Sequence, residues 1–126
     1  MNENIMDDRY QQSLLYDFYG ELLTEHQKEI YSDYILNDYS LGEIASEHGI
    51  TRQGVHDLIK RCNKTLASYE EKLKLVERFS NAKKKVSEIR QITDELKNLN
   101  ENHKDEHVDR EIQMIDQIAQ DILKDF

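Results

Sequence analysis

No proline occurs anywhere in the 126 residues of this chain, and only four residues are glycine. Folds built from strands and tight turns draw on both residue types, whereas long amphipathic helices avoid them. The composition agrees with helices, because 34% of the residues are charged and 37% are hydrophobic. The sequence therefore predicts an all-α protein with room for one domain, or for one compact unit and an extension.

Helix starts are marked along the first third of the chain. From Asp7 to Leu23 apolar residues recur at intervals of three and four, which predicts a first amphipathic helix. Thr24 followed by Gln27, and Ser40 followed by Glu43, match the capping box, in which side chain and backbone satisfy each other at a helix start. The sequence thus predicts a second helix after residue 24 and a third, short helix after residue 40.

Residues 40–69 have the pattern of a helix-turn-helix motif. Ala45 is small where two helices must cross closely, and Gly49 stands where left-handed backbone is expected just past a helix end. Thr51 is placed to cap the next helix, which runs toward Tyr69. The core shared by the two helices is expected to contain Ile44, Ile50, Val55 and Leu58. The alternative is an ordinary corner between two helices with no binding role.

The net charge of −9 opposes binding to nucleic acid, whose phosphates attract a basic surface. The charge is unevenly spread, however. Residues 1–40 carry nine acids and two bases, residues 41–69 carry three acids and four bases, and residues 70–126 carry fourteen acids and eleven bases. Only the motif has a positive balance, although an excess of one base is also what a small fluctuation gives.

Residues in the second helix of the motif are the candidates for contact with a duplex. Its first turns are expected to face base edges and its flanks to face phosphates, and geometry pairs Arg with guanine and Gln with adenine. The candidate base-edge contacts are Thr51, Arg52, Gln53 and His56. The candidate phosphate contacts are Lys60, Arg61 and Lys64. Each has a plainer alternative, since Thr51 is at least a cap and the others can be a solvated face.

The last third of the chain is charged and heptad-like. Residues 81–100 and 107–125 carry narrow apolar seams and are joined by the wholly polar stretch Glu101–His107. They predict an antiparallel hairpin, or else the same seams form a dimer interface. The seams are Val86, Ile89, Ile92, Leu96 and Leu99, then Val108, Ile112, Ile115, Ala119 and Ile122. We therefore expect a helix-turn-helix domain over 1–70 and a helical extension over 71–126 that is a candidate dimerisation element.

The sequence offers little for a membrane protein or an enzyme. No apolar run approaches the roughly 20 residues that span a bilayer, and Met1–Asn4 lacks the basic and apolar parts of a secretory signal, so we expect a cytoplasmic protein. The single cysteine, Cys62, cannot form an internal disulfide. His103 and His107 are spaced like two zinc ligands but lack a third. With no phosphate loop or nucleophile motif, we expect no catalysis, metal or cofactor.

Leu23–Lys28, Asp38–Ala45 and Ile50–Gln53 resemble region 4 of bacterial sigma factors, which recognises the −35 promoter element. More specifically, Thr51–Arg61 with Tyr69–Leu73 resembles the YlxM-like family of small helix-turn-helix proteins. This resemblance spans about residues 10–80 and, more loosely, the tail. The chain lacks the sigma region that melts promoter DNA, so it is not expected to act as a sigma factor alone.

The resemblance implies a sigma region 4-like helix-turn-helix bundle. The family is typically encoded beside the genes for the signal recognition particle protein Ffh and its receptor FtsY, which implies a link to protein targeting. One hypothesis is a DNA-binding regulator, a homodimer whose tail helices space two recognition helices. The other is an accessory protein that contacts the particle RNA or Ffh, its acidic remainder suiting a basic partner.

Overall fold

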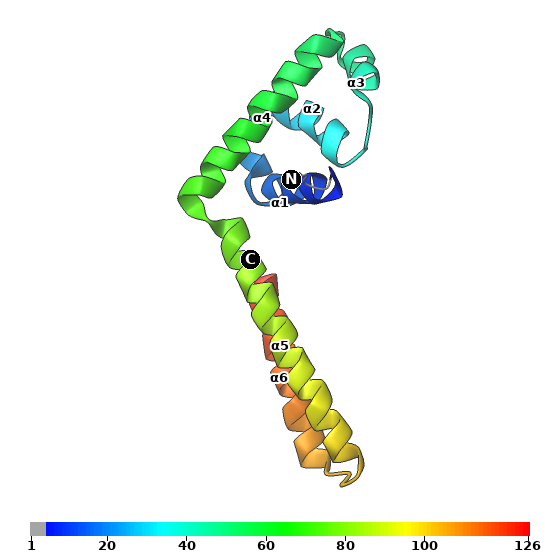
Figure 1. The fold of residues 1–126 in the computed structure, drawn as a ribbon, viewed down its shortest axis with the longest axis vertical. Coiled ribbons are helices and arrows are strands. Elements are labelled where there is room, and N and C mark those ends of the chain that lie inside the picture. Colours follow the sequence, from blue (N-terminus) through cyan, green and yellow to red (C-terminus); the bar gives the residue numbers. More distant parts are fainter. Residues whose placement is uncertain (1–4) are drawn as a thin grey trace. The chain divides into compact units, whose positions relative to one another are not determined.

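The computed structural model describes residues 5–126, and Met1–Asn4, for which no secretory signal is expected, lies outside the described residues. Across this range every regular element is a helix, which confirms the all-α prediction (Figure 1). No helix of residues 5–126 is long and apolar enough to cross a membrane. The helices are α1 (Ile5–Tyr19), the short 3-10 helix η1 (Gly20–Leu22), α2 (Glu25–Ile35), α3 (Leu41–His48), α4 (Arg52–Leu73), α5 (Leu75–Glu101) and α6 (Glu106–Lys124).

The chain forms two compact units, the first ending at Val76 and the second comprising Glu77–Phe126. In the first unit, α4 packs against α1, α2 and α3. The core lies where these helices meet, and it includes the two buried tyrosines Tyr19 and Tyr31. Its other buried side chains are Leu23, Ile30, Ile44, Ala45, Val55, Ile59, Cys62, Leu66 and Val76.

Both predicted capping boxes are present. The Thr24 hydroxyl oxygen accepts from the backbone N–H of Gln27 at 3.2 Å, and the Gln27 side chain accepts from the backbone N–H of Thr24 at 3.1 Å. Ser40 and Glu43 make the same reciprocal pair, at 3.1 and 2.9 Å. The backbone hydrogen bond from Ser40 holds the pKa of Glu43 below its usual range. Local chemistry therefore sets where α2 and α3 begin.

The α3–α4 pair forms the predicted helix-turn-helix. Gly49 has φ 67° and its N–H bonds the carbonyl of Ala45, so α3 ends in the left-handed backbone that glycine adopts without strain. Thr51 then caps α4. Of the expected shared core, Ile44 and Val55 are fully buried, whereas Ile50 and Leu58 are half-buried at its edge. α4 continues to Leu73, one turn beyond Tyr69.

In the second unit, α5 and α6 form an antiparallel hairpin within the chain (Figure 1). The Thr93 hydroxyl donates to Oδ1 of Asp116 at 2.7 Å, and the Asn100 amide donates to Oδ1 of Asp109 at 2.8 Å. Between residues 77 and 126, the hairpin that the sequence predicted as one alternative is therefore present. It uses only part of the predicted seams, because these polar pairs occupy positions in the contact between the helices.

Candidate nucleic-acid interface

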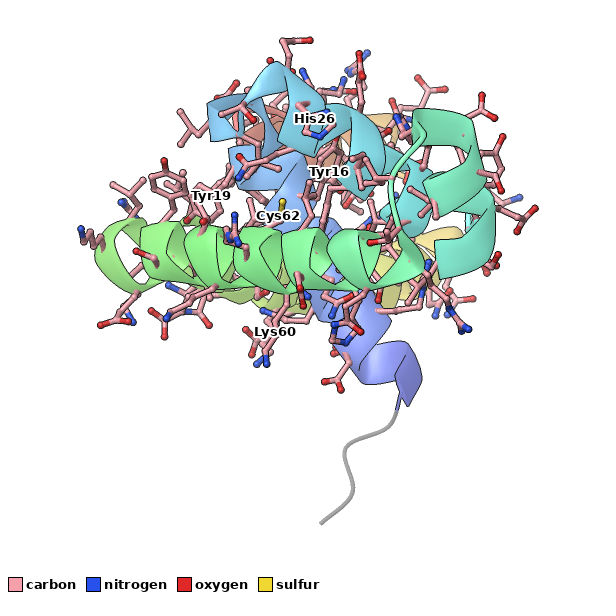
Figure 2. All side chains as sticks on the ribbon, turned by 90° about the horizontal axis from the view of Figure 1, so that it is seen from above. Tyr16, Tyr19, His26, Lys60 and Cys62 are labelled. Atoms are coloured by element: carbon pink, nitrogen blue, oxygen red, sulfur yellow. The ribbon has the colours of Figure 1, made fainter. Side chains whose placement is uncertain are left out.

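Four of the candidate residues form one exposed stripe along α4. Gln53, His56, Lys60 and Lys64 follow one another at intervals of three, four and four, so they lie on one side of the helix. All four are exposed. Figure 2 shows Lys60 extending from the side of α4 opposite to Tyr16 and His26, while Cys62 points toward them. The core therefore holds one face of α4 and leaves the opposite face open to a partner.

The first turn of α4 has its own hydrogen-bond pattern. The Thr51 hydroxyl oxygen accepts from the backbone N–H of Gly54 at 2.9 Å, so Thr51 acts as the cap of the helix. A Cβ added at Gly54 would lie 3.1 Å from that oxygen, a tight contact that would press on the cap. Arg52 is exposed beside the cap. The Gln53 amide donates to Oδ1 of Asp57 at 3.0 Å.

Positive charge is concentrated in the first half of α4. Residues 52–64 carry four bases, Arg52, Lys60, Arg61 and Lys64, against the single acid Asp57. All of these side chains are exposed. Consecutive residues are about 100° apart around a helix, so Arg61 lies to the side of the Lys60–Lys64 stripe rather than on it. The arrangement suits contacts to two phosphate strands on either side of an inserted helix.

Asp57 is the member of this surface that the sequence reasoning missed. Its Oδ1 accepts from Gln53 and lies 3.6 Å from Nδ1 of His56. The signal was its position four residues after Gln53, on the same helix face. Asp57 orients the candidate base-edge side chain of Gln53, and it also places a negative charge among the bases.

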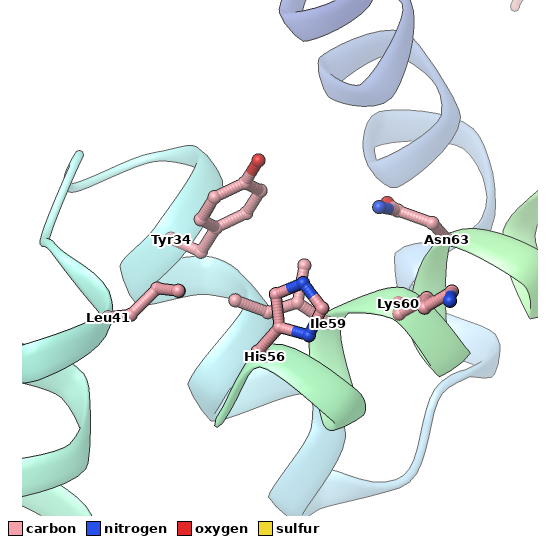
Figure 3. Close-up of a pocket in the computed structure, with 6 residues that line it drawn as sticks. All are labelled: Tyr34, Leu41, His56, Ile59, Lys60 and Asn63. Carbon is pink, nitrogen blue, oxygen red and sulfur yellow. The ribbon is translucent and has the colours of Figure 1, made fainter. Parts of the chain in front are cut away.

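A shallow, mainly apolar cavity of about 280 Å³ adjoins the stripe (Figure 3). Tyr34 and Leu41 border it from α2 and α3, across from the α4 residues. The α4 residues that line it are His56, Ile59, Lys60 and Asn63. The Asn63 side chain is already engaged, because its Oδ1 accepts from the Tyr31 hydroxyl. The cavity thus brings apolar surface and the edge of the basic stripe together.

The cysteine and the two histidines singled out as possible reactive or metal-binding groups do not belong to the exposed α4 surface. Cys62 is fully buried, and burial raises the pKa of its thiol to about 11, so it is a poor nucleophile near neutral pH. His103 lies in the turn after α5, and His107 lies in the first turn of α6 with Nε2 3.8 Å from Glu111. No group of three or more metal-binding side chains gathers within residues 5–126.

Three known proteins that are similar to this chain are all UPF0122 proteins. A UPF0122 protein of Caldanaerobacter subterraneus is 52% identical over 85 residues, which are 68% of this chain and 73% of that protein. A UPF0122 protein of Thermoanaerobacter sp. is 42% identical over 116 residues, covering 92% and 94% of the two chains. One of Acetivibrio thermocellus is 54% identical over 84 residues, covering 67% and 72%.

Residues 6–108 match the UPF0122 family, whose description is "Putative helix-turn-helix protein, YlxM / p13 like". This match takes in α2, the complete α3–α4 motif and α5. Since the motif, its geometry and the relatives all agree, the chain belongs to the YlxM / p13 like helix-turn-helix family.

Proposed function

We propose that this protein is a DNA-binding regulator that inserts the N-terminal half of α4 into the major groove. The observation that carries the proposal is the exposed basic face of α4, held by a helix-turn-helix whose core lies on the other side. A helix-turn-helix presents its second helix in this way, with the first turns toward base edges. Family membership supports the same class of function.

In this proposal, the α4 side chains divide into two roles. Arg52, Gln53 and His56, in the first turns, contact base edges, with Thr51 capping the helix beside them. Lys60, Arg61 and Lys64, one to three turns further along, contact phosphates. The bases of α4 supply affinity that depends on salt, because each phosphate contact releases counterions.

The test is crosslinked recovery of the tagged full-length protein from cells, with sequencing of both DNA and RNA. We expect discrete genomic sites, and we expect these sites to be lost with Arg52→Glu. Lys72→Glu is the matched control, because Lys72 is an exposed base on the same helix but lies in its last turn. Binding to a recovered site in vitro should weaken with Lys60→Glu, and the slope of log affinity against log salt should fall by about 1.

Two outcomes would contradict the proposal. One is the absence of discrete DNA sites from a well-expressed protein. The other is an unchanged set of sites with Arg52→Glu and Lys60→Glu, since a surface that binds through these side chains cannot tolerate charge reversal at both. Circular dichroism on each variant checks that its helices are intact.

A second candidate function is an accessory role in which the protein binds the signal recognition particle RNA or Ffh. Asp57 within the basic surface, and the excess of acids outside residues 41–69, favour a basic protein partner over bare phosphates. The same recovery experiment separates the two functions. Enriched particle RNA, or Ffh in the sample without discrete DNA sites, would favour this role.

A further inference from the structure

The second unit buries polar side chains between its helices and leaves apolar ones outside. Thr93 is 1% exposed and Asn100 is 6% exposed, in the contact between α5 and α6. Large apolar residues that stay exposed are Ile92, Leu96 and Leu99 on α5, and Met114, Ile115, Ile118 and Ile122 on α6. A helix is normally stabilised by packing its apolar stripe on another element, so this hairpin has only part of a core.

The exposed apolar residues of the two helices lie on the same face of the hairpin. Leu96 and Leu99 of α5 and Val108 of α6 line one shallow cavity, so the apolar edges of the two helices meet there. Val108, Ile115 and Ile122 are seven residues apart, which places them in one line along α6. Ile92 lies seven residues before Leu99 and continues the edge along α5. The result is one apolar surface about 20 Å long, given a rise of 1.5 Å per residue.

We propose that this surface, called the hairpin face and formed by Ile92, Leu96, Leu99, Ile115, Ile118 and Ile122, packs against the same face of a second copy of the chain. Two hairpins joined in this way make a four-helix bundle with the apolar stripes of all four helices inside. This inference is independent of the proposed DNA binding, because the hairpin face contains none of the residues of the α4 surface.

The exposed area of the hairpin face fits such a dimer. Ile92, Leu99 and Ile118 are 57%, 64% and 59% exposed, and the other three members are 39–44% exposed. Together they leave an apolar surface on the order of several hundred Å², the size of patch that often marks an interaction site. Each partner in a standard interface contributes roughly 800 Å², so the face and its rim are large enough for a stable dimer.

Charges at the open end of the hairpin face point to an identical partner in parallel orientation. Lys85, Ile92 and Leu99 form one line at intervals of seven, and Glu111, Ile118 and Asp125 form another. Lys85 and Asp125 both lie toward the open end of the hairpin, where Phe79 meets Phe126.

A two-fold axis along the hairpin brings the two open ends together and places α5 of each copy over α6 of the other. Thr93 bonds Asp116 across the hairpin, so Lys85, eight residues before Thr93, is level with residue 124 of α6. Lys85 therefore faces Asp125 of the second copy, and the symmetry repeats the pair. An axis perpendicular to the hairpin would place α5 over α5, so Lys85 would face neither Glu111 nor Asp125 of the second copy.

Sedimentation velocity on the full-length protein, over a series of concentrations, tests the inference. We expect a dimer for the unmodified chain. Ile118→Glu should raise the dimer dissociation constant by at least about tenfold, because each dimer would bury two unpaired charges. Gln113→Glu is the matched control, since Gln113 is exposed on the far side of α6. Circular dichroism confirms that both variants keep their helices.

A charge-reversal cycle tests the orientation. Lys85→Glu and Asp125→Lys should each weaken the dimer, and the double variant should restore it, because the pair is reformed with opposite signs. A monomer at all concentrations would overturn the inference and leave the hairpin face to another macromolecule. A dimer that is unaffected by Ile118→Glu would also overturn it, since the contact would then lie elsewhere.

Discussion

The hydroxyl of Tyr19 donates a hydrogen bond of 2.6 Å to Oε1 of Glu70. The same carboxylate oxygen accepts from the backbone N–H of Val76 at 2.9 Å, and the Tyr19 hydroxyl oxygen accepts from the N–H of Leu75 at 3.1 Å. Lys74, between the end of α4 and the start of α5, has a left-handed φ of 58°. The end of α1, the end of α4 and the start of α5 are therefore joined through two side chains, which satisfy the first N–H groups of α5.

Tyr19→Phe removes this hydroxyl and should lower the free energy of unfolding by about 1.5–3 kcal/mol, the range for a hydrogen bond to a charged group. Urea denaturation of the full chain measures the change. Tyr10→Phe is the matched control, because Tyr10 lies on the same helix and is 56% exposed, and it should shift the midpoint little. Equal effects of the two substitutions would show that the Tyr19–Glu70 bond contributes nothing.

Thr51→Ala should lower the free energy of unfolding by about 1 kcal/mol, because the N–H of Gly54 loses its acceptor. Thr51→Ser keeps that acceptor and should recover most of the loss. Thermal unfolding followed by circular dichroism measures both. Ser68→Ala, at an exposed hydroxyl further along α4, controls for the change to alanine. If Thr51→Ser were as unstable as Thr51→Ala, capping would not be the role of this hydroxyl.

Cys62 should react very slowly with a thiol reagent in the folded protein. The side chain is fully buried and its pKa is raised to about 11, so little thiolate is present at pH 8 and that little is out of reach. Ellman's reagent measures the rate, and the protein in urea serves as the control, with full reaction expected. Rapid reaction without denaturant would mean that the core around Cys62 opens readily.

Alkaline pH should destabilise the fold in two steps, first through Cys62 and then through Tyr19 and Tyr31. Burial raises the pKa of Cys62 from about 9 to about 11, and it raises the pKa values of Tyr19 and Tyr31 from their ordinary value near 10. The unfolded chain therefore loses these protons first, so stability falls as pH rises. The loss should begin near pH 9 with Cys62 and steepen above pH 10 with the tyrosines.

Urea midpoints measured from pH 7 to pH 11 check this order. Cys62→Ala should remove the fall between pH 9 and pH 10, whatever its effect on stability at neutral pH. A flat profile up to pH 11 in the unmodified chain would contradict the burial of all three groups.

Much of the fold was predictable because its signals are local. The caps at Thr24, Ser40 and Thr51 and the turn at Gly49 depend on residues within four positions of one another, and all are present. The hairpin interior was not predictable in the same way. Thr93 interrupts the apolar seam, and its burial depends on a bond to Asp116, 23 residues away. No periodic pattern signals such a pair.

The features of the candidate site also differ in whether local sequence signals them. The seven candidate contacts were assigned from their place in the second helix of the motif, and the structure leaves all of them exposed. The bond from Gln53 to Asp57 had only the signal of a spacing of four, and the cavity bordered by Tyr34 and Leu41 depends on helix packing that no local pattern indicates. Which bases or phosphates these side chains contact stays a prediction.

The Asn100 side chain bridges the two sides of the α5–α6 turn. Its amide donates to the carbonyl of Asp105 at 2.9 Å, and its Oδ1 accepts from the Asp105 N–H at 3.2 Å, so one side chain joins residues only five positions apart. Closing a loop this short takes well under a microsecond, and later contacts can add in sequence from the turn outward. Contacts of this local kind give fast folding. Residues 77–126 can therefore reach their paired form early in refolding, starting at the turn.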